Sequence, residues 1–424
     1  MSSPFSKHTL DNGLTLVFET IPRINSAALG FFVNTGSRDE PAELAGVSHF
    51  LEHMCFKGTT KRDWRQLTLD VDDLGAMWNA YTWWEGTAYF HWVQSGRAGD
   101  SIEILSDMMR STLPPDEFDM EKKVILEEIA MYRDRPDALI VDELIQDIFA
   151  DHPLGRSILG TEETVGGITR DQMADYFQRR YAPNNLTFII TGKFDRDEII
   201  RAVETHCGGW APQETGRTQP APTFHTATRT VKRDNVSREH LALARSAPPE
   251  ADTWATTADL LATYLGAASN SRLFWSIVQK GLADEVSADY YGFSDTGLFY
   301  LYASVDPKNV SRVLDIVRQE MADLKKGVDA EALARARTKH ATALVCRGEH
   351  GLSRFSQIVH SLSTNTPLKT LEEEIAEIDA VTPKRIAEYL EAYPLDGDFS
   401  LVALGPMESL NQANADVEYP QEVL

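Results

Sequence analysis

An internal repeat constrains the fold of this chain more than any other feature. Two stretches of about 40 residues carry the same residue types in the same order, at an offset of 214 residues for the first matched position and 213 for the others. The matched positions are Pro153, Thr169, Tyr176 and Gly192 in the first stretch and Pro367, Thr382, Tyr389 and Gly405 in the second. An offset this constant indicates two homologous domains of about 200 residues each.

The length of the chain agrees with this division. A chain of 424 residues exceeds the usual size of a domain built around one hydrophobic core. Residues 213–228 contain two prolines and no apolar periodicity, as expected for a linker. The sequence therefore predicts an N-terminal domain over residues 1–212 and a homologous C-terminal domain over residues 229–424.

The pattern of apolar residues within each half predicts the class of fold. Alternating apolar residues near the start of each half, such as Leu14, Leu16 and Phe18, are typical of half-buried strands. Amphipathic helices are predicted over residues 169–181 and 382–393, each beginning at a threonine that can cap it. We expect an α+β fold in which each half is a mainly antiparallel sheet with helices packed on one side.

Charge and composition exclude several classes of partner. The chain has 41 Lys and Arg against 64 Asp and Glu, a formal net charge of −23. Such a surface repels phosphate backbones and anionic lipids, so we expect no nucleic-acid partner and no membrane partner. The sequence also lacks an apolar run of the roughly 20 residues that a membrane span needs.

The cysteines and the N-terminus indicate a cellular location. Cys55, Cys207 and Cys346 are odd in number and widely spaced, which predicts neither a disulfide framework nor a thiolate zinc finger. The N-terminus shows no charged segment followed by an apolar one. A reducing, cytoplasmic location is therefore expected.

The segment Ser48–His53 carries the strongest chemical signal. On a helix, His49 and His53 lie four residues apart and place two imidazoles on one face, where they can share a cation. Glu52 points to the same side and is suited to act as a general base on a metal-bound water, as in an inverted HExxH motif. The alternative is a solvated or core helix whose histidines bind nothing, and the motif alone leaves both interpretations open.

A third ligand is expected on a second helix, over residues 115–132. The neighbours of Glu128 at three and four residues' distance are all apolar: Val124, Ile125, Met131 and Tyr132. A carboxylate in such a patch is costly to bury without a cation, which favours Glu128 as a metal ligand. Glu127 has Lys123 as its neighbour and is expected to be solvated. Glu121, on the same face two turns before Glu128, is predicted to lie near the metal.

Both motifs resemble those of the M16 zinc peptidases, the inverzincins, which include processing peptidases and insulin-degrading enzyme. The similar segments are HFLEHMCFKGT and EKKVILEEIAMYRDRP, and the interval from His53 to Glu128 is 75 residues. The resemblance implies a zinc metalloendopeptidase that hydrolyses peptides or unfolded polypeptides in a closed chamber between two facing domains. His49, His53 and Glu128 would hold zinc, Glu52 would be the general base, and Glu121 would assist.

A further segment resembles the substrate-binding strand of the same family. Residues 79–89, NAYTWWEGTAY, are similar to the family's NAxTxxExTxY. The resemblance implies an edge strand beside the zinc, to which an extended peptide adds as another strand. Asn79 would contact the substrate through its amide and Ala80 through its backbone. We expect most of the aromatic rings in this segment to serve packing.

The second half departs from the family in a way that bears on partners. Members active on their own carry a segment like RLFxxxREKxGLAY, whose second Arg and final Tyr hold the substrate. Here Arg272 is retained as the motif's structural arginine, but Val278 and Asp284 stand where that Arg and Tyr belong. The resemblance therefore implies a homologous subunit that supplies the pair in a heterodimer. A homodimer, or a lone chain in which Tyr290 or Tyr291 takes over, is the alternative.

A non-catalytic role is the competing functional hypothesis. Respiratory-chain core proteins resemble this family, so the chain could be a structural or peptide-binding subunit. The complete set of metal-spaced residues with an adjacent base argues against that role, because a scaffold does not need them.

Overall fold

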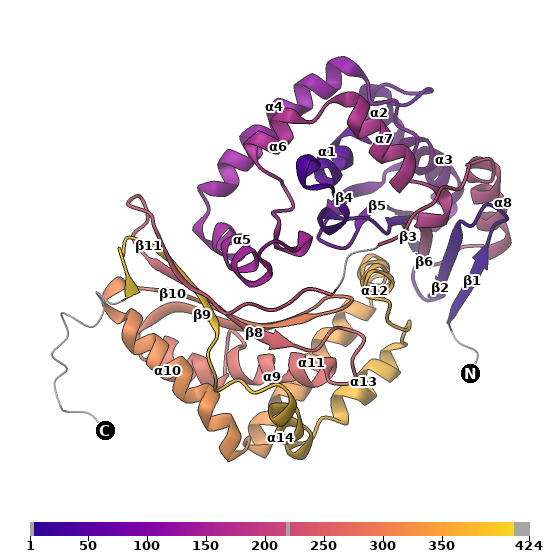
Figure 1. The fold of residues 1–424 in the computed structure, drawn as a ribbon. Coiled ribbons are helices and arrows are strands. Elements are labelled where there is room, and N and C mark those ends of the chain that lie inside the picture. Colours follow the sequence, from indigo (N-terminus) through magenta and orange to yellow (C-terminus); the bar gives the residue numbers. More distant parts are fainter. Residues whose placement is uncertain (1–3, 218–220, 411–424) are drawn as a thin grey trace, which may run out of the picture. The chain divides into compact units, whose positions relative to one another are not determined.

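The computed structural model describes residues 4–217 and 221–410. They form two compact units, and each unit draws on both halves of the sequence. Unit 1 comprises Met1–Met131, Arg156–Pro220 and Val345–Leu371; unit 2 comprises Tyr132–Gly155, Ala221–Leu344 and Glu372–Leu424. Both units are α+β with a mixed, mainly antiparallel sheet, which confirms the expected fold class (Figure 1).

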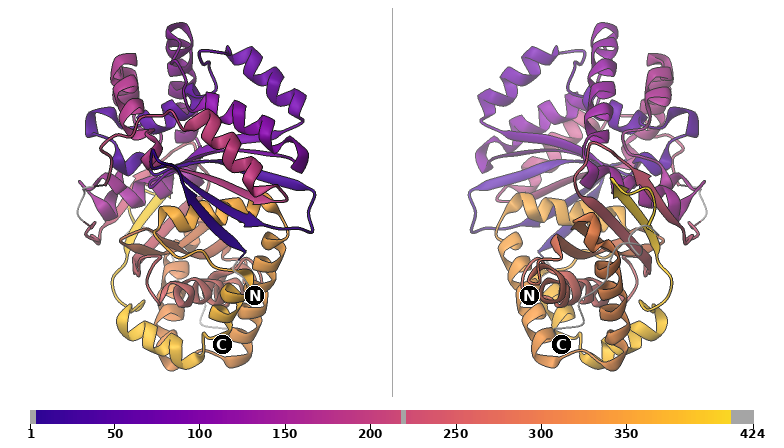
Figure 2. Two further views of the ribbon diagram at one scale, coloured as in Figure 1. Left: turned by 90° about the vertical axis from the view of Figure 1, so that its right-hand side faces the viewer. Right: turned by 90° about the vertical axis from the view of Figure 1, so that its left-hand side faces the viewer.

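Unit 1 is built on a six-stranded sheet. In spatial order its strands are β1 (Phe5–Thr9), β2 (Thr15–Thr20), β6 (Leu186–Gly192), β3 (Ser26–Val33), β5 (Thr87–Gln94) and β4 (Met77–Thr82). Only the β2–β6 pair is parallel. The strands twist relative to one another, as the side views in Figure 2 show. Strand β4 lies at one edge of this sheet.

Most helices of unit 1 come from the first half of the sequence. They are α1 (Val47–Met54), α2 (Trp64–Leu74), α3 (Ala98–Met108), α4 (Pro115–Arg133), α6 (Glu162–Gly167), α7 (Arg170–Arg180) and α8 (Arg196–Cys207). Their apolar side chains share one core with alternate residues of β3, Leu29 and Phe31 among them. The remaining face of the sheet is covered by α12 (Gly351–Ser363), from the second half, whose Phe355 packs with Ala28 and Phe32.

Unit 2 is built on a five-stranded sheet. In spatial order its strands are β7 (Thr228–Lys232), β11 (Ser400–Gly405), β8 (Glu239–Ala247), β10 (Gly297–Val305) and β9 (Ala283–Gly292). The helices lying wholly or mainly in this unit are α5 (Pro136–Phe149), α9 (Ala255–Gly266), α10 (Val310–Asp323), α11 (Ala330–Gly348), α13 (Leu371–Asp379) and α14 (Pro383–Ala392). Helix α5 packs against β8 and β11 on the side opposite α9, α10 and α14 (Figure 1).

The two halves therefore exchange one helix each. Helix α5 comes from the first half and covers unit 2, while α12, which starts 215 residues later, comes from the second half and covers unit 1. The sequence predicted helices on one side of each sheet, but α12 and α5 cover the opposite side of the two sheets, so each sheet has helices on both faces. The physical reason is that β3 is buried along almost its whole length and β11 along all of it. Strands buried on both faces need a cover on both.

The segment expected to be a linker is fixed to unit 1 at its start. The Asn184 side-chain amide donates to the carbonyl of Gln213 at 2.8 Å, and the Arg217 guanidinium binds the Asp39 carboxylate at 2.9 Å. Residues 218–220 lie outside the described part of the chain, and Thr228 begins β7. The domain boundaries at residues 212 and 229 remain a prediction.

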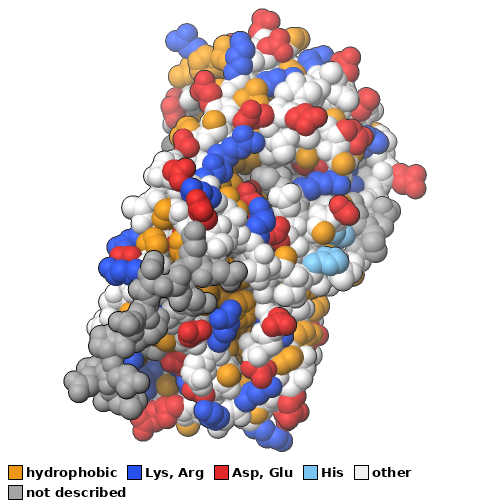
Figure 3. Space-filling view, turned by 60° about the vertical axis from the view of Figure 1, so that its left-hand side comes forward, with side chains coloured by type: hydrophobic (Ala, Val, Ile, Leu, Met, Phe, Trp, Pro, Cys, Tyr) orange, Lys and Arg blue, Asp and Glu red, His pale blue; other side chains and the backbone are white. Residues whose placement is uncertain are grey.

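Helix hydropathy and surface charge relate to the expectation of no membrane partner and no nucleic-acid partner. None of the helices in residues 4–217 and 221–410 has both the length and the hydropathy of a membrane-spanning segment. On the face drawn in Figure 3, acidic side chains are interspersed with basic ones and do not form one continuous patch.

Candidate metal centre

Helix α1 carries the HxxEH motif and is fixed firmly at its start. The Glu40 carboxylate accepts hydrogen bonds from the backbone amides of Gly46 and Ser48, both at 2.7 Å. Gly46 has a φ of 93°, and a Cβ atom there would lie 2.6 Å from the Leu159 carbonyl oxygen, so only glycine fits this entry. The apolar side chains of α1 are buried, which holds both histidines on the other face.

Three predicted ligands meet between α1 and α4. The imidazole rings of His49 and His53 have centroids 4.7 Å apart. The Nε2 atom of each ring lies 3.8 Å from Oε2 of Glu128. All three ligand atoms lie within 4.8 Å of one another, and this is the only such group of His, Cys, Asp and Glu among the described residues.

This donor set fits a zinc ion. Zinc binds imidazole nitrogens and carboxylate oxygens at about 2.0–2.2 Å, so ligand atoms around a tetrahedral ion are separated by about 3.3–3.6 Å. The two histidine–glutamate separations of 3.8 Å exceed this range by a few tenths of an ångström, and all three ligand atoms lie within 4.8 Å of one another, so the three side chains need to close in slightly around an ion. Two histidines and one glutamate also leave a fourth position open, as in hydrolytic zinc sites.

Glu121 fixes the orientation and tautomer of His53. Its Oε1 atom lies 2.9 Å from Nδ1 of His53, and its Oε2 atom lies 2.6 Å from Nζ of Lys57. Burial would raise the pKa of Glu121, but the hydrogen bonds of His53 and Lys57 outweigh it and lower the pKa. An ionised Glu121 accepts the Nδ1 proton of His53, so in the neutral imidazole Nε2 carries the lone pair on the side of Glu128. Burial lowers the pKa of His53, but the hydrogen bond to Glu121 and the nearby Glu52 and Glu128 outweigh it and raise the pKa, so a metal competes with a proton for Nε2.

His49 is held differently from His53. It is buried, and its Nδ1 atom has no hydrogen-bond partner among the described residues. Burial, reinforced by the nearby His53, lowers the pKa of His49 to about 3. The His49 imidazole is therefore neutral at ordinary pH, which is the state that binds a metal.

Glu52 lies beside the ligand group and contacts the neighbouring strand. Its Oε2 atom accepts a hydrogen bond from the Thr82 hydroxyl on β4 at 2.6 Å. Burial raises the pKa of the Glu52 carboxyl, and the hydrogen bond from Thr82 and the neighbouring His53 offset that rise only partly. A carboxyl with a raised pKa, with one oxygen held by a threonine, is suited to proton transfer.

Glu128 does not lie in the buried apolar patch that its sequence neighbours predicted. The Glu128 side chain is 43% exposed, and its neighbours Val124 and Met131 are 44% and 70% exposed, so it does not lie in a buried apolar patch. Glu128 instead continues the stripe of α4 that packs inward through Glu121 and Ile125. Glu127 is exposed, as expected.

The predicted substrate strand is β4, at the edge of the sheet of unit 1. Asn79 is exposed, and its Oδ1 atom accepts from the backbone amide of Ala80 at 2.9 Å. Ala80 pairs with Tyr89 of β5, and the other edge of β4 has no strand partner among the described residues. Tyr89 is fully buried and its hydroxyl bonds that of Tyr181, consistent with a packing role for that ring.

Two contacts at the site were not anticipated from the sequence. Thr82 and Lys57 lie inside the quoted motifs, but no role was predicted for either. Lys57 lies beyond the end of α1 at Met54, so helical spacing from His53 carries no signal for its contact with Glu121. Thr82 reaches Glu52 through the placement of β4 beside α1, for which a single sequence carries no signal.

The segment in which the Arg and Tyr pair is missing lies in unit 2. Arg272 pairs with Glu320 at 2.6 Å, a structural contact. Val278 ends a short π-helix over Phe274–Val278, and Asp284 pairs with Arg238 at 2.7 Å. The Tyr290 hydroxyl donates to the Pro248 carbonyl at 2.8 Å, while Tyr291 is 44% exposed.

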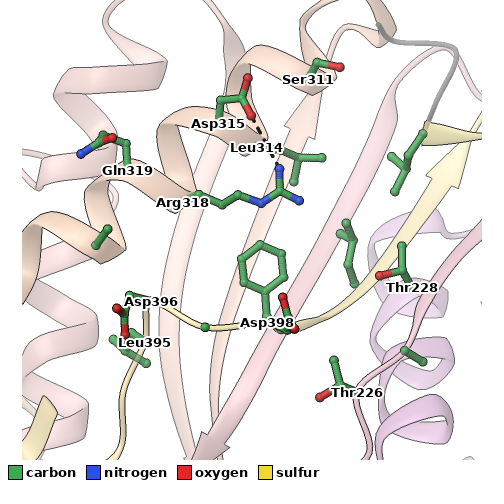
Figure 4. A pocket seen from close by; sticks show the side chains of 16 residues that line it. Thr226, Thr228, Ser311, Leu314, Asp315, Arg318, Gln319, Leu395, Asp396 and Asp398 are labelled. Carbon is green, nitrogen blue, oxygen red and sulfur yellow. Dashed lines mark ion pairs between the residues drawn. The ribbon is translucent and has the colours of Figure 1, made fainter. Parts of the chain in front are cut away.

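Unit 2 also contains a hollow of about 980 Å³. It lies between α10 and the start of β11, and Arg318 reaches into it near Asp315 and Phe399 (Figure 4). None of the predicted site residues lines it, so it is separate from the metal centre.

Comparisons with known proteins identify the family. The model of the insulinase family, peptidase family M16, matches residues 15–162, and the model of the M16 inactive domain matches residues 167–339. The uncharacterized zinc protease YmxG of Bacillus subtilis is 30% identical over 94% of this chain and 98% of its own length. The chain therefore belongs to the M16 peptidase family.

Solved structures share the fold. A protease from Helicobacter pylori has a TM-score of 0.89 at 21% identity, over 95% of this chain and 99% of its own. A chain in the structure of complex III2 from Candida albicans has a TM-score of 0.83 at 19% identity, over 96% of this chain and 98% of its own.

Proposed function

We propose that this chain is a zinc-dependent metalloendopeptidase that hydrolyses peptides or unfolded polypeptides. The observation that carries this proposal is the convergence of His49, His53 and Glu128, whose ligand atoms lie within 4.8 Å of one another. The family membership and the relative named a zinc protease support it.

In this proposal His49, His53 and Glu128 hold the zinc ion, and Glu121 orients His53. Bound zinc would polarise the peptide carbonyl and lower the pKa of a water molecule. Glu52 takes a proton from the attacking water and returns it to the leaving amine. Thr82 holds Oε2 of Glu52, so Oε1 is the atom free to carry that proton.

The substrate would bind as an added strand on β4. Main-chain hydrogen bonds to an edge strand align an extended peptide whatever its side chains. Asn79 would contribute its amide and Ala80 its backbone. This mode fits polypeptides that are unfolded or short enough to lie extended.

The test separates zinc binding from proton transfer. Glu52→Gln keeps the ligand set, so it should retain one zinc per chain and lose about 10²–10⁴-fold or more in the turnover of a quenched-fluorescent peptide mixture. Loss of zinc from this variant would contradict the assigned roles. Wild-type chain that holds zinc and cleaves nothing, alone or with a partner, would contradict the endopeptidase function.

A second candidate is a non-catalytic subunit of the same family. It is favoured by the absence of the Arg and Tyr pair at Val278 and Asp284 and by the shared fold with a chain of complex III2. We place it second because a structural subunit does not need Glu52 next to the ligand group.

We also propose a homologous partner subunit and a cytoplasmic location. The partner would carry the Arg and Tyr that this chain lacks, and a second copy of this chain is the alternative. The location is supported by the cysteines, since all three are free thiols, as in proteins of reducing compartments.

A further inference from the structure

Lys57 forms a contact that couples it to the metal centre. It lies just after α1, and its Nζ atom is 2.6 Å from Oε2 of Glu121. The other oxygen of Glu121 is the one that lies 2.9 Å from Nδ1 of His53. The Glu121 side chain is only 6% exposed, so little water is available to replace either partner.

This arrangement restrains the carboxylate of Glu121 at both ends. With one oxygen bound to an ammonium and the other facing an imidazole, rotation about the last side-chain bond would break both contacts. Charge-assisted hydrogen bonds of this length are strong where solvent is scarce. The position of Nδ1 of His53, and through it the direction of Nε2, therefore depends on Lys57.

We propose that Lys57 is a positioning residue of the metal centre. It fixes Glu121, which fixes the tautomer and ring orientation of His53, so that Nε2 faces the ligand position before the metal arrives. This inference rests on the proposed zinc site. Groups that hydrogen-bond a metal-ligating histidine directly, as Glu121 would, typically contribute about 10–100-fold in metal affinity, which is the upper limit for a residue that acts through Glu121.

Lys61 provides a matched control. It lies four residues further along the same loop, and its Nζ atom is 2.7 Å from Oε1 of Glu103. That distance is close to the one at Lys57, but the Lys61 side chain is 55% exposed and neither residue contacts a predicted ligand. Removing it tests what the loss of a lysine ion pair does by itself.

The experiment measures zinc affinity by competition with a chromophoric chelator at one pH, together with the unfolding temperature of the zinc-free chain. Lys57→Met should weaken zinc binding by about tenfold, the lower end of the range for a direct partner of a ligand, and Lys57→Arg should recover most of that loss. Lys61→Met should leave affinity within about twofold, as expected for an exposed ion pair. Lys57→Gln serves as a second variant if the methionine variant does not fold.

A double-mutant cycle separates positioning from a general structural effect. If Lys57 acts through Glu121, Lys57→Met should change zinc affinity little in a Glu121→Gln background. Wild-type affinity in both Lys57→Met and Lys57→Gln, or an equal loss with and without Glu121, would overturn the inference. Wild-type chain that binds no zinc would overturn the zinc site as well, whereas chain that binds zinc and cleaves no peptide, either alone or with a partner subunit, would overturn only the endopeptidase function.

Discussion

At the candidate metal centre, one helical step separates a carboxylate that meets both histidines from one that faces solvent. Glu128 and Glu127 are adjacent on α4, but only Glu128 joins the group with His49 and His53. The 100° turn between consecutive helical residues is the whole difference. Chemical type therefore matters less here than the angle at which the helix presents each side chain.

This difference predicts the behaviour of two conservative variants. Glu128→Gln removes the charged oxygen that lies 3.8 Å from each Nε2 atom, so zinc affinity should fall by at least about tenfold, because zinc prefers an ionised carboxylate to an amide. Glu127→Gln should leave affinity near that of wild type. Competition titration with a chelator measures both, and equal affinities or the reverse order would contradict the assignment of Glu128.

Residue spacing was enough to place part of this site but not its supports. The pairs His49 with His53 and Glu121 with Glu128 follow helical periodicity, a local property that a sequence displays directly. The meeting of α1 with α4 was expected from the apolar neighbours of Glu128, an argument that the exposure of those neighbours does not support, and from the interval known in the family. The contact of Thr82 with Glu52 depends on where β4 lies relative to α1, which is a tertiary property with no local signal.

At the scale of elements, each sheet depends on a helix from the other half of the sequence. Helix α12 is anchored in unit 1 by Arg354, whose guanidinium lies 3.0 Å from the buried Glu19 carboxylate, and by Phe355 in the core of that face. The repeat and the α+β class could be predicted, because periodicity and offset are local patterns. The exchange of helices between the two halves could not be predicted. The nearly continuous apolar run in β3 is typical of a strand buried on both faces, but it does not say which helix covers the second face.

We expect a core substitution in α12 to destabilise unit 1, despite its distance in sequence. Phe355→Ala should lower the free energy of unfolding by about 3–5 kcal/mol, because Phe355 is fully buried and its removal leaves a cavity. Ser353→Ala, at a half-buried position of the same helix, should change it by less than about 0.5 kcal/mol. Denaturant unfolding followed by hydrogen exchange in β3 and β6 measures both. Unchanged protection of these strands in Phe355→Ala would contradict the packing of α12.

A buried carboxyl at the start of β8 predicts a pH dependence of stability. One oxygen of Glu239 accepts from the backbone amide of Met407 at 3.1 Å, and the other has no partner among the described residues. Burial raises its pKa from 4.5 to about 7. Between these values the folded chain holds a proton that the unfolded chain has released, so the contribution of Glu239 to stability falls as pH rises and levels off above about pH 7.

The uncharged variant Glu239→Gln should lack this dependence. Its stability relative to wild type should rise between pH 5 and pH 8 by about 1–3 kcal/mol, the size expected for a shift of this kind. Denaturant titrations at several pH values measure the differences, and a constant difference between Glu239→Gln and wild type would show that Glu239 does not titrate in this range.

At the scale of the whole molecule, the chain holds every residue of the proposed zinc site, but the resemblance predicts that it lacks an Arg and a Tyr in the second half. Val278 and Asp284 occupy those positions, and Asp284 is engaged with Arg238. An arginine and a tyrosine at a peptidase site hold the substrate and the developing charge, which lowers the barrier without touching the metal. Zinc binding and turnover should therefore separate in this chain.

We expect the purified chain alone to bind zinc tightly and to cleave peptides far below the usual range of about 1–10³ s⁻¹. A homologous subunit that carries the Arg and Tyr should restore turnover when the two are expressed together. Light scattering gives the oligomeric state, and assays with and without the partner give turnover per zinc. Full turnover by a monomer would remove the need for a partner. In that case, a loss of turnover in Tyr291→Phe but not in Tyr290→Phe would show that the exposed Tyr291 supplies the hydroxyl. Tyr290 is the less suitable residue because its hydroxyl already donates to the Pro248 carbonyl. Full turnover that appears only in a dimer of this chain would instead favour the homodimer.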